Sequence, residues 1–247
     1  MGRYIATVFT AVILSVPCLP ARAVEGDAKE ILDKGIKALG GEEKLAKAEA
    51  ITWKTKGTIK FNDNENEFTG FVTIKGLDHF RRESGNDQFS VVVVLAGEKG
   101  WRKFGDNATE LEGDGLANEK RRVYLEVIPA TLVPLKGKGF KYEAGGEEKV
   151  GDKPAVSLKA TGPDDKTFTI FFDKESGLPV KMTAKVVGFQ GQENDLETTY
   201  SDYKDFDGIK KATKIEVKRD GETFQKMEHS DFKVLDKVDS DVFTEPK

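Results

Sequence analysis

The side chains that most often carry catalysis are scarce in this chain. His79 and His229 are its only histidines, and a general-base pair would require them to meet in space. The sequence contains no Gly-x-Ser-x-Gly elbow, no His-Glu-x-x-His pair, no phosphate-binding loop and no dinucleotide fingerprint. Charged neighbours flank both histidines, which favours two exposed or sheet-edge positions. We therefore predict that the protein is not an enzyme and holds no cofactor.

Metal ligands are equally sparse. The single cysteine, Cys18, falls in the N-terminal leader discussed below, so it is not expected in the mature chain. Asp202, Asp205 and Asp207 stand close together, but their spacing does not make an EF-hand loop. The pair Asp207-Gly208 is instead typical of a tight hairpin turn. No metal site is expected.

Apolar side chains are the remaining candidates for a site. Trp53 and Trp101 are the residues best suited to contact a ligand, and packing in a core is the alternative role for both. Arg81 and Arg82 suit either an anionic head group at a cavity mouth or a solvated strand edge. The candidates for lining an apolar cavity are Trp53, Ile59, Phe68, Val72, Ile74, Trp101, Leu132, Ile170, Phe172 and Met182.

The N-terminus has the pattern of an export signal. Arg3 precedes an uncharged run from Tyr4 to Val16, which as a helix would rise about 20 Å, short of a membrane core of roughly 30 Å. Pro17 and Pro20 follow, and Ala21-Arg22-Ala23 provides the small residues that signal peptidase requires. We predict a signal peptide over residues 1–23, cleavage after Ala23, and a periplasmic or secreted product. A retained membrane anchor is the alternative.

Net charge limits the class of partner. The whole chain carries −4, and removal of Arg3 and Arg22 with the leader makes the mature chain more acidic. Binding to nucleic acid requires clustered basic charge, so nucleic acid is not an expected partner.

The elements that must position these residues follow from periodicity. Helical spacing over 27–39 and 42–49, separated by Gly40-Gly41, predicts a helical hairpin. From Ala50 the period changes to two, and a continuous apolar run over 88–95 predicts a strand covered on both faces. Residues 113–135 interrupt the strands with a helical pattern that Pro129 should end or kink. We count ten or eleven strands and expect a single domain over 24–247.

Several segments resemble a known family. The run Ala38-Leu39-Gly40-Gly41-Glu42-Glu43-Lys44-Leu45, followed by a strand ending Lys56-Gly57-Thr58-Ile59, is similar to the opening of proteins with the LolA/LolB-like fold of the outer-membrane lipoprotein-sorting carriers. The segment from Phe171 to Lys181 resembles that family's strand, turn and returning strand. Tyr200 to Lys210 resembles its next hairpin, and Asp239 to Pro246 its ending. The resemblance implies an α+β fold, in which a strongly curved antiparallel sheet (a half-barrel) is capped by helices and encloses a cavity for acyl chains.

Three functions follow as hypotheses. The first is a carrier or binder that holds a lipid, or the acyl chains of a lipoprotein, in an apolar half-barrel, with residues 113–135 as its lid. The second is a structural or sensor module with a filled core that binds a protein partner on its surface. The third is an exported hydrolase with a histidine beside a carboxylate or hydroxyl in a cleft. For the first we expect a monomer that makes transient contact with a membrane or an envelope protein.

Overall fold

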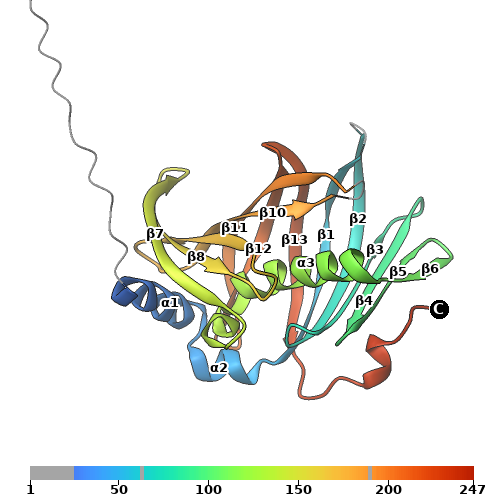
Figure 1. Ribbon diagram of the computed structural model, residues 1–247, viewed down its shortest axis with the longest axis horizontal. Coiled ribbons are helices and arrows are strands. Elements are labelled where there is room, and N and C mark those ends of the chain that lie inside the picture. Colours follow the sequence, from blue (N-terminus) through green and yellow to red (C-terminus); the bar gives the residue numbers. More distant parts are fainter. Residues whose placement is uncertain (1–24, 62–63, 189–190) are drawn as a thin grey trace, which may run out of the picture.

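The protein is built around one continuous antiparallel sheet. A computed structural model describes residues 25–61, 64–188 and 191–247, so the predicted signal peptide lies outside the described residues. Thirteen strands lie in the order β6-β5-β4-β3-β2-β1-β13-β12-β11-β10-β9-β8-β7 (Figure 1). Their bounds are β1 Ala50–Phe61, β2 Asn64–Lys75, β3 His79–Gly85, β4 Ser90–Ala96, β5 Lys99–Phe104, β6 Asn107–Glu110, β7 Lys141–Val150, β8 Lys153–Thr161, β9 Thr167–Asp173, β10 Pro179–Val187, β11 Glu193–Phe206, β12 Ile209–Arg219 and β13 Glu222–Val234.

The strand order divides the sheet into two arms, an N-terminal arm of β1 to β6 and a C-terminal arm of β7 to β13. In each arm, strands that follow one another in the chain are also neighbours in space, as expected for hairpin connections. The arms meet where β1 pairs with β13, with Ile51 opposite Val234 and Ile59 opposite Gln225. The sheet is not closed, because β6 and β7 end it on opposite sides.

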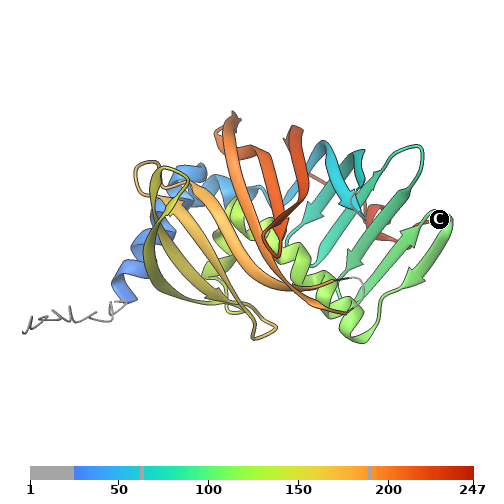
Figure 2. The same cartoon turned by 90° about the horizontal axis from the view of Figure 1, so that it is seen from above.

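Three helices supply the cover that the sheet needs. In Figures 1 and 2, α3 (Gly113–Thr131) lies inside the curve of the sheet and crosses its strands. At the end of one arm, α1 (Glu25–Leu39) packs against β7 and β8, and α2 (Glu42–Lys47) follows it. The buried side chains of α1 recur at helical spacing, at Ala28, Leu32, Ile36 and Leu39. The expected curved sheet with a helical hairpin and a mid-chain helix is confirmed.

Two glycines allow the α1–α2 corner to lie close against the β11–β12 turn. Gly40 has φ +137°, and a Cβ added to it would lie 2.4 Å from the carbonyl oxygen of Gly208. Gly208 itself has φ +83° and sits in the turn, where its N–H donates to Asp205 Oδ1 at 2.7 Å. Gly40 demands glycine because a Cβ would meet backbone and its φ is strained, whereas at Gly208 a Cβ would meet the Lys44 side chain and the positive φ is what favours glycine.

Two details differ from the sequence-based expectation. The sheet has thirteen strands instead of ten or eleven, because short β6 and the polar β7–β8 hairpin lack a clear apolar alternation. Helix α3 continues through Pro129 to Thr131, and its end is set by Leu132, which adopts φ 61° and donates its N–H to Ile128. None of the helices in the described ranges is long and apolar enough to cross a membrane.

The C-terminal segment explains the apolar run of β4. A 3₁₀ helix, η2 (Ser240–Phe243), packs against β3 and β4 and buries Phe243. Val93 points into the curve of the sheet, so its neighbour Val94 points to the other face, where it is fully buried. Both faces of β4 are therefore covered, as predicted.

Candidate ligand-binding site

A cavity of about 280 Å³ lies between the concave face of the sheet and α3. Its walls come from β1 to β5, from β10 to β13 and from the inner face of α3. Most of the lining is apolar, and it includes Trp53, Phe68, Val72, Val93, Leu125, Met182, Ile215, Val217 and Met227. The volume falls near the lower end of the roughly 300–1,000 Å³ that is usual for ligand pockets.

Five of the ten residues proposed from the sequence line this cavity. These are Trp53, Ile59, Phe68, Val72 and Met182. A further four lie in the packed core instead, namely Ile74, Leu132, Ile170 and Phe172. Trp101 precedes Arg102 in β5, and because Arg102 faces the cavity, Trp101 points to the other face. Ligand contact by any of the ten stays a prediction.

Charged side chains also enter the cavity, which the sequence analysis largely missed. Arg82 of β3 donates to Glu126 at 2.8 Å, and Arg102 of β5 donates to Glu119 at 2.6 Å. Arg122 lies 3.8 Å from the same Glu119 carboxylate. Glu119, Arg122 and Glu126 are spaced at i, i+3 and i+7, so a helical reading of 113–135 could have placed them on one face. The ion pairs of Arg82 and Arg102 connect α3 to the N-terminal arm of the sheet, whereas the Arg122–Glu119 pair lies within the helix.

Lys211 is the most deeply buried cation of the cavity. The residue is only 6% exposed, and its ammonium lies 4.1 Å from the ring centre of Trp53 and 5.2 Å from that of Phe232. Burial lowers the pKa of Lys211 to about 8, an effect opposed by the charge of Glu126. Alternation from Ile215 and Val217 could have predicted that Lys211 shares their inward face.

The two histidines do not form a catalytic pair. His79 contacts Asp78 at 3.0 Å and the ring of Phe243, and it does not line the cavity. His229 does line the cavity, lies in the middle of the sheet and is partly buried beside Trp53. The expectation of two exposed or edge histidines is therefore wrong for His229, since alternation along β13 turns it inward. Burial, together with the nearby Lys211 charge, lowers its pKa to about 2, so its ring is neutral at physiological pH.

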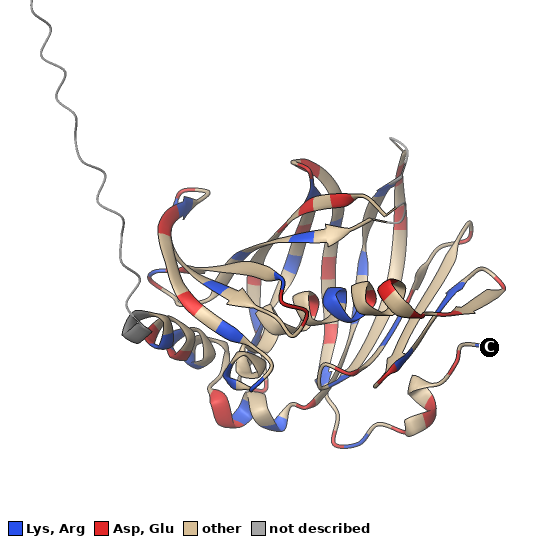
Figure 3. Cartoon of the chain, viewed as in Figure 1, with Lys and Arg blue, Asp and Glu red and all other residues tan. Residues whose placement is uncertain are grey.

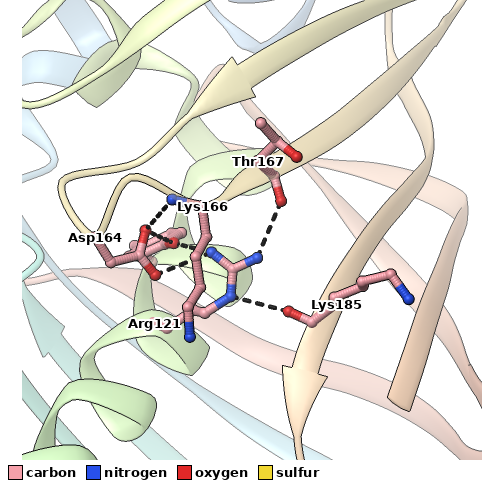
Figure 4. Close-up of polar contacts among 6 residues, drawn as sticks. Arg121, Asp164, Lys166, Thr167 and Lys185 are labelled. Atoms are coloured by element: carbon pink, nitrogen blue, oxygen red, sulfur yellow. Dashed lines mark hydrogen bonds and ion pairs between the residues drawn. The ribbon is translucent and has the colours of Figure 1, made fainter. Parts of the chain in front are cut away.

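A second polar cluster holds α3 from its other side (Figure 4). The Arg121 side chain is 2% exposed, and its guanidinium donates to Asp164 Oδ2 at 3.1 Å, to the Lys185 carbonyl at 3.0 Å and to the Thr167 carbonyl at 3.0 Å. Tyr124 accepts from Arg121 and donates to Asp164 Oδ1 at 2.7 Å. Because β9 and β10 belong to the C-terminal arm, α3 is tied by charge to both arms of the sheet.

The surface chemistry is mixed elsewhere. Figure 3 shows Lys and Arg interspersed with Asp and Glu along the strands and helices. Within the ranges that the structure describes, no three His, Cys, Asp or Glu side chains are grouped as metal ligands would be.

Comparison with solved structures decides the fold. A LolA superfamily protein from Nitrosomonas europaea aligns with a TM-score of 0.58, over 88% of this chain and 97% of its own, at 13% identity. The chain described here therefore has a LolA-like fold. A DUF1329 family protein from Desulfovibrio piger aligns with a TM-score of 0.56 at 13% identity, again over 88% of this chain and 97% of its own. A candidate outer membrane lipoprotein-sorting protein domain from Vibrio parahaemolyticus covers 86% of this chain and 97% of its own, with a TM-score of 0.54 and 10% identity.

The likeness to LolA-like proteins is one of structure. No protein-family model matches the chain, and a search of curated proteins finds no match. The fold implied by the resemblance of the turn and strand segments is confirmed.

Proposed function

We propose that this LolA-like chain is an exported, non-catalytic protein that binds the apolar chain of a lipid or of an acylated protein. The observation that carries the proposal is the cavity of about 280 Å³ between sheet and α3. A structural module with a filled core would leave no such space. A hydrolase would need a histidine paired with a carboxylate or hydroxyl there, and His229 instead contacts Trp53, with its Nδ1 unpartnered among the described side chains.

The energetics favour a chain-shaped ligand. Each CH₂ group transferred from water to an apolar wall contributes about 0.8 kcal/mol, so a chain of ten buried groups gains about 8 kcal/mol before ordering costs. Val72 of β2 and Val93 of β4 line the cavity on either side of β3, and Val217 lines it from β12 in the other arm. The space between them suits one acyl chain better than several.

The similar solved structures and the leader fit an envelope role. The Vibrio domain is described by its name as a candidate for outer membrane lipoprotein sorting. In our proposal residues 1–23 direct export and residues 24–247 form the single binding domain, with transient contact to a membrane or envelope protein.

Helix α3 is the proposed lid. It closes the cavity along one side, and the ion pairs of Arg82 and Arg102 hold it to the N-terminal arm. Entry or release of a chain would require these pairs to open while Arg121 keeps α3 attached to the C-terminal arm.

The test uses protein exported with its own leader and purified without detergent. Organic extraction and mass spectrometry should find a co-purified lipid, and the emptied protein should bind a fluorescent fatty acid. Val72→Trp fills the cavity and should abolish that binding, whereas Phe71→Trp, on the exposed outer face of the same strand, should not. Thr55→Phe on β1 provides a second cavity-filling variant if the first does not fold. Protein that carries no lipid and binds no fatty acid would refute the proposal.

A further inference from the structure

The charge inside the cavity is unbalanced. Six cationic side chains line it, Arg82, Arg102, Arg122, Lys210, Lys211 and Arg219, against two carboxylates, Glu119 and Glu126. Both carboxylates already accept hydrogen bonds from arginines, at 2.6 and 2.8 Å. The excess is therefore positive, in a space whose walls are otherwise mainly apolar.

Of these cations, Lys211 is the most deeply buried, so the free-energy cost of desolvating its charge is the highest. Among the side chains that the structure describes, its ammonium contacts only the faces of Trp53 and Phe232, without a hydrogen bond or ion pair. Cation–π contact offsets part of the cost of burying a charge, but an ammonium has three N–H donors that aromatic faces do not satisfy. An anionic group in the cavity would satisfy these donors and neutralise the charge.

We infer that Lys211 binds the anionic head group of an amphiphile whose single apolar tail occupies the rest of the cavity. The inference rests on the proposed function and adds a ligand class to it. Arg219 lines the cavity eight residues beyond Lys211 on β12, which is about 25 Å from Lys211 at the rise of an extended strand. Its guanidinium is stacked 3.4 Å from the ring centre of Phe224. The tail would therefore run from Lys211 along β12 between apolar walls, past Ile215 and Val217.

The head group is a carboxylate or a phosphate ester. Either presents oxygens that accept charge-assisted hydrogen bonds from an ammonium. An alcohol with the same chain length would leave the Lys211 charge unpaired. An acid and an alcohol of one chain length therefore differ only in the ionic contact between head group and Lys211.

The experiment titrates lipid-free protein calorimetrically with dodecanoate, dodecanol and dodecyl phosphate at pH 7, each below its aggregation threshold. The wild-type protein should bind dodecanoate or dodecyl phosphate about ten- to a hundredfold more tightly than dodecanol. Lys211→Met should remove that preference and leave dodecanol affinity unchanged. Lys214→Met, an exposed lysine of the same strand that pairs with Asp202 at 3.4 Å, should leave all affinities unchanged.

The two proposals fail in different ways. If dodecanol binds but the anions gain nothing over it, or if Lys211→Met keeps their advantage, Lys211 is not the anion site. If Lys211→Met weakens all three probes equally, its role is structural and the inference is overturned. If no probe binds the wild-type protein, the proposed function itself is wrong. Whichever of dodecanoate and dodecyl phosphate binds more tightly identifies the preferred head group as carboxylate or phosphate.

Discussion

The Arg121 cluster offers a direct measure of how firmly α3 is held. Arg121→Met keeps most of the volume of the side chain but removes its donors to Asp164 and to the carbonyl groups of Thr167 and Lys185 (Figure 4). Breaking a buried ion pair by removing one partner costs about 3–5 kcal/mol. The Asp164 side chain keeps 23% of its surface exposed, so water compensates part of the loss and we expect about 3 kcal/mol.

Urea denaturation of the mature protein would measure this free energy of unfolding, and a thermal scan should show Tm lowered by about 6–12 °C. Arg121→Lys should lose about 2 kcal/mol, because an ammonium cannot reach the several acceptors that the planar guanidinium joins. Lys120→Met is the matched control. Its partner Glu98 is 94% exposed, so this neighbouring change should cost less than about 0.5 kcal/mol. An Arg121→Met protein as stable as this control would show that the cluster does not hold α3.

Three further predictions concern stability. The Lys211 pKa is about 8 in the folded protein against 10.5 ordinarily, so the unfolded chain binds more protons between those values. Stability should rise with pH across that window by about 3 kcal/mol, and urea titrations of Lys211→Met should lack this rise. The His229 pKa is about 2 against 6.5, so the unfolded chain takes up a proton below pH 6.5 while the folded one does not. Wild-type stability should fall by up to about 2 kcal/mol from pH 7 to pH 5, a loss that His229→Leu should reduce; equal losses in both proteins would contradict the assigned burial. Gly40→Ala should cost about 3 kcal/mol in a thermal or urea titration, because its Cβ meets Gly208 and its φ is strained. Gly41→Ala, with φ +89° and open space around its Cβ, should cost only about 1 kcal/mol, and equal costs would refute the close approach.

Much of the fold could be predicted because alternation is a local property. The strands that carry Trp53, Phe68 and Met182 place these residues on one face, and tight Asp-Gly turns such as Asp207-Gly208 join neighbouring strands. The faces followed from residue spacing alone. Edge strands are different: every residue of β6 is exposed, and β7, although α1 packs against it, has no fully buried residue, so neither strand needs a full apolar face.

The candidate site was harder to predict, because the type of a residue does not show whether the curvature of the sheet turns its side chain into the cavity. Arg82 and Lys211 have the residue type of a solvated surface, yet curvature turns their strand faces inward. Trp101 has the residue type of a core or ligand contact, yet the adjacent Arg102 takes the inward position. Burial of charge depends on elements distant in sequence, here Glu126 and Phe232, and no local pattern reports them.

The pairing of β1 with β13 has a consequence for how the chain folds. Every other strand pair joins strands that are close in sequence, so loop closure costs little and hairpins of either arm can form early. The β1–β13 seam instead joins Ile51 to Val234 and must close the longest loop in the sheet. We therefore expect seam formation to be the slow step of folding. Until residues 222–234 dock, β1 displays an unpaired edge at what will become the middle of the sheet, and any segment able to add a strand there competes with the native one.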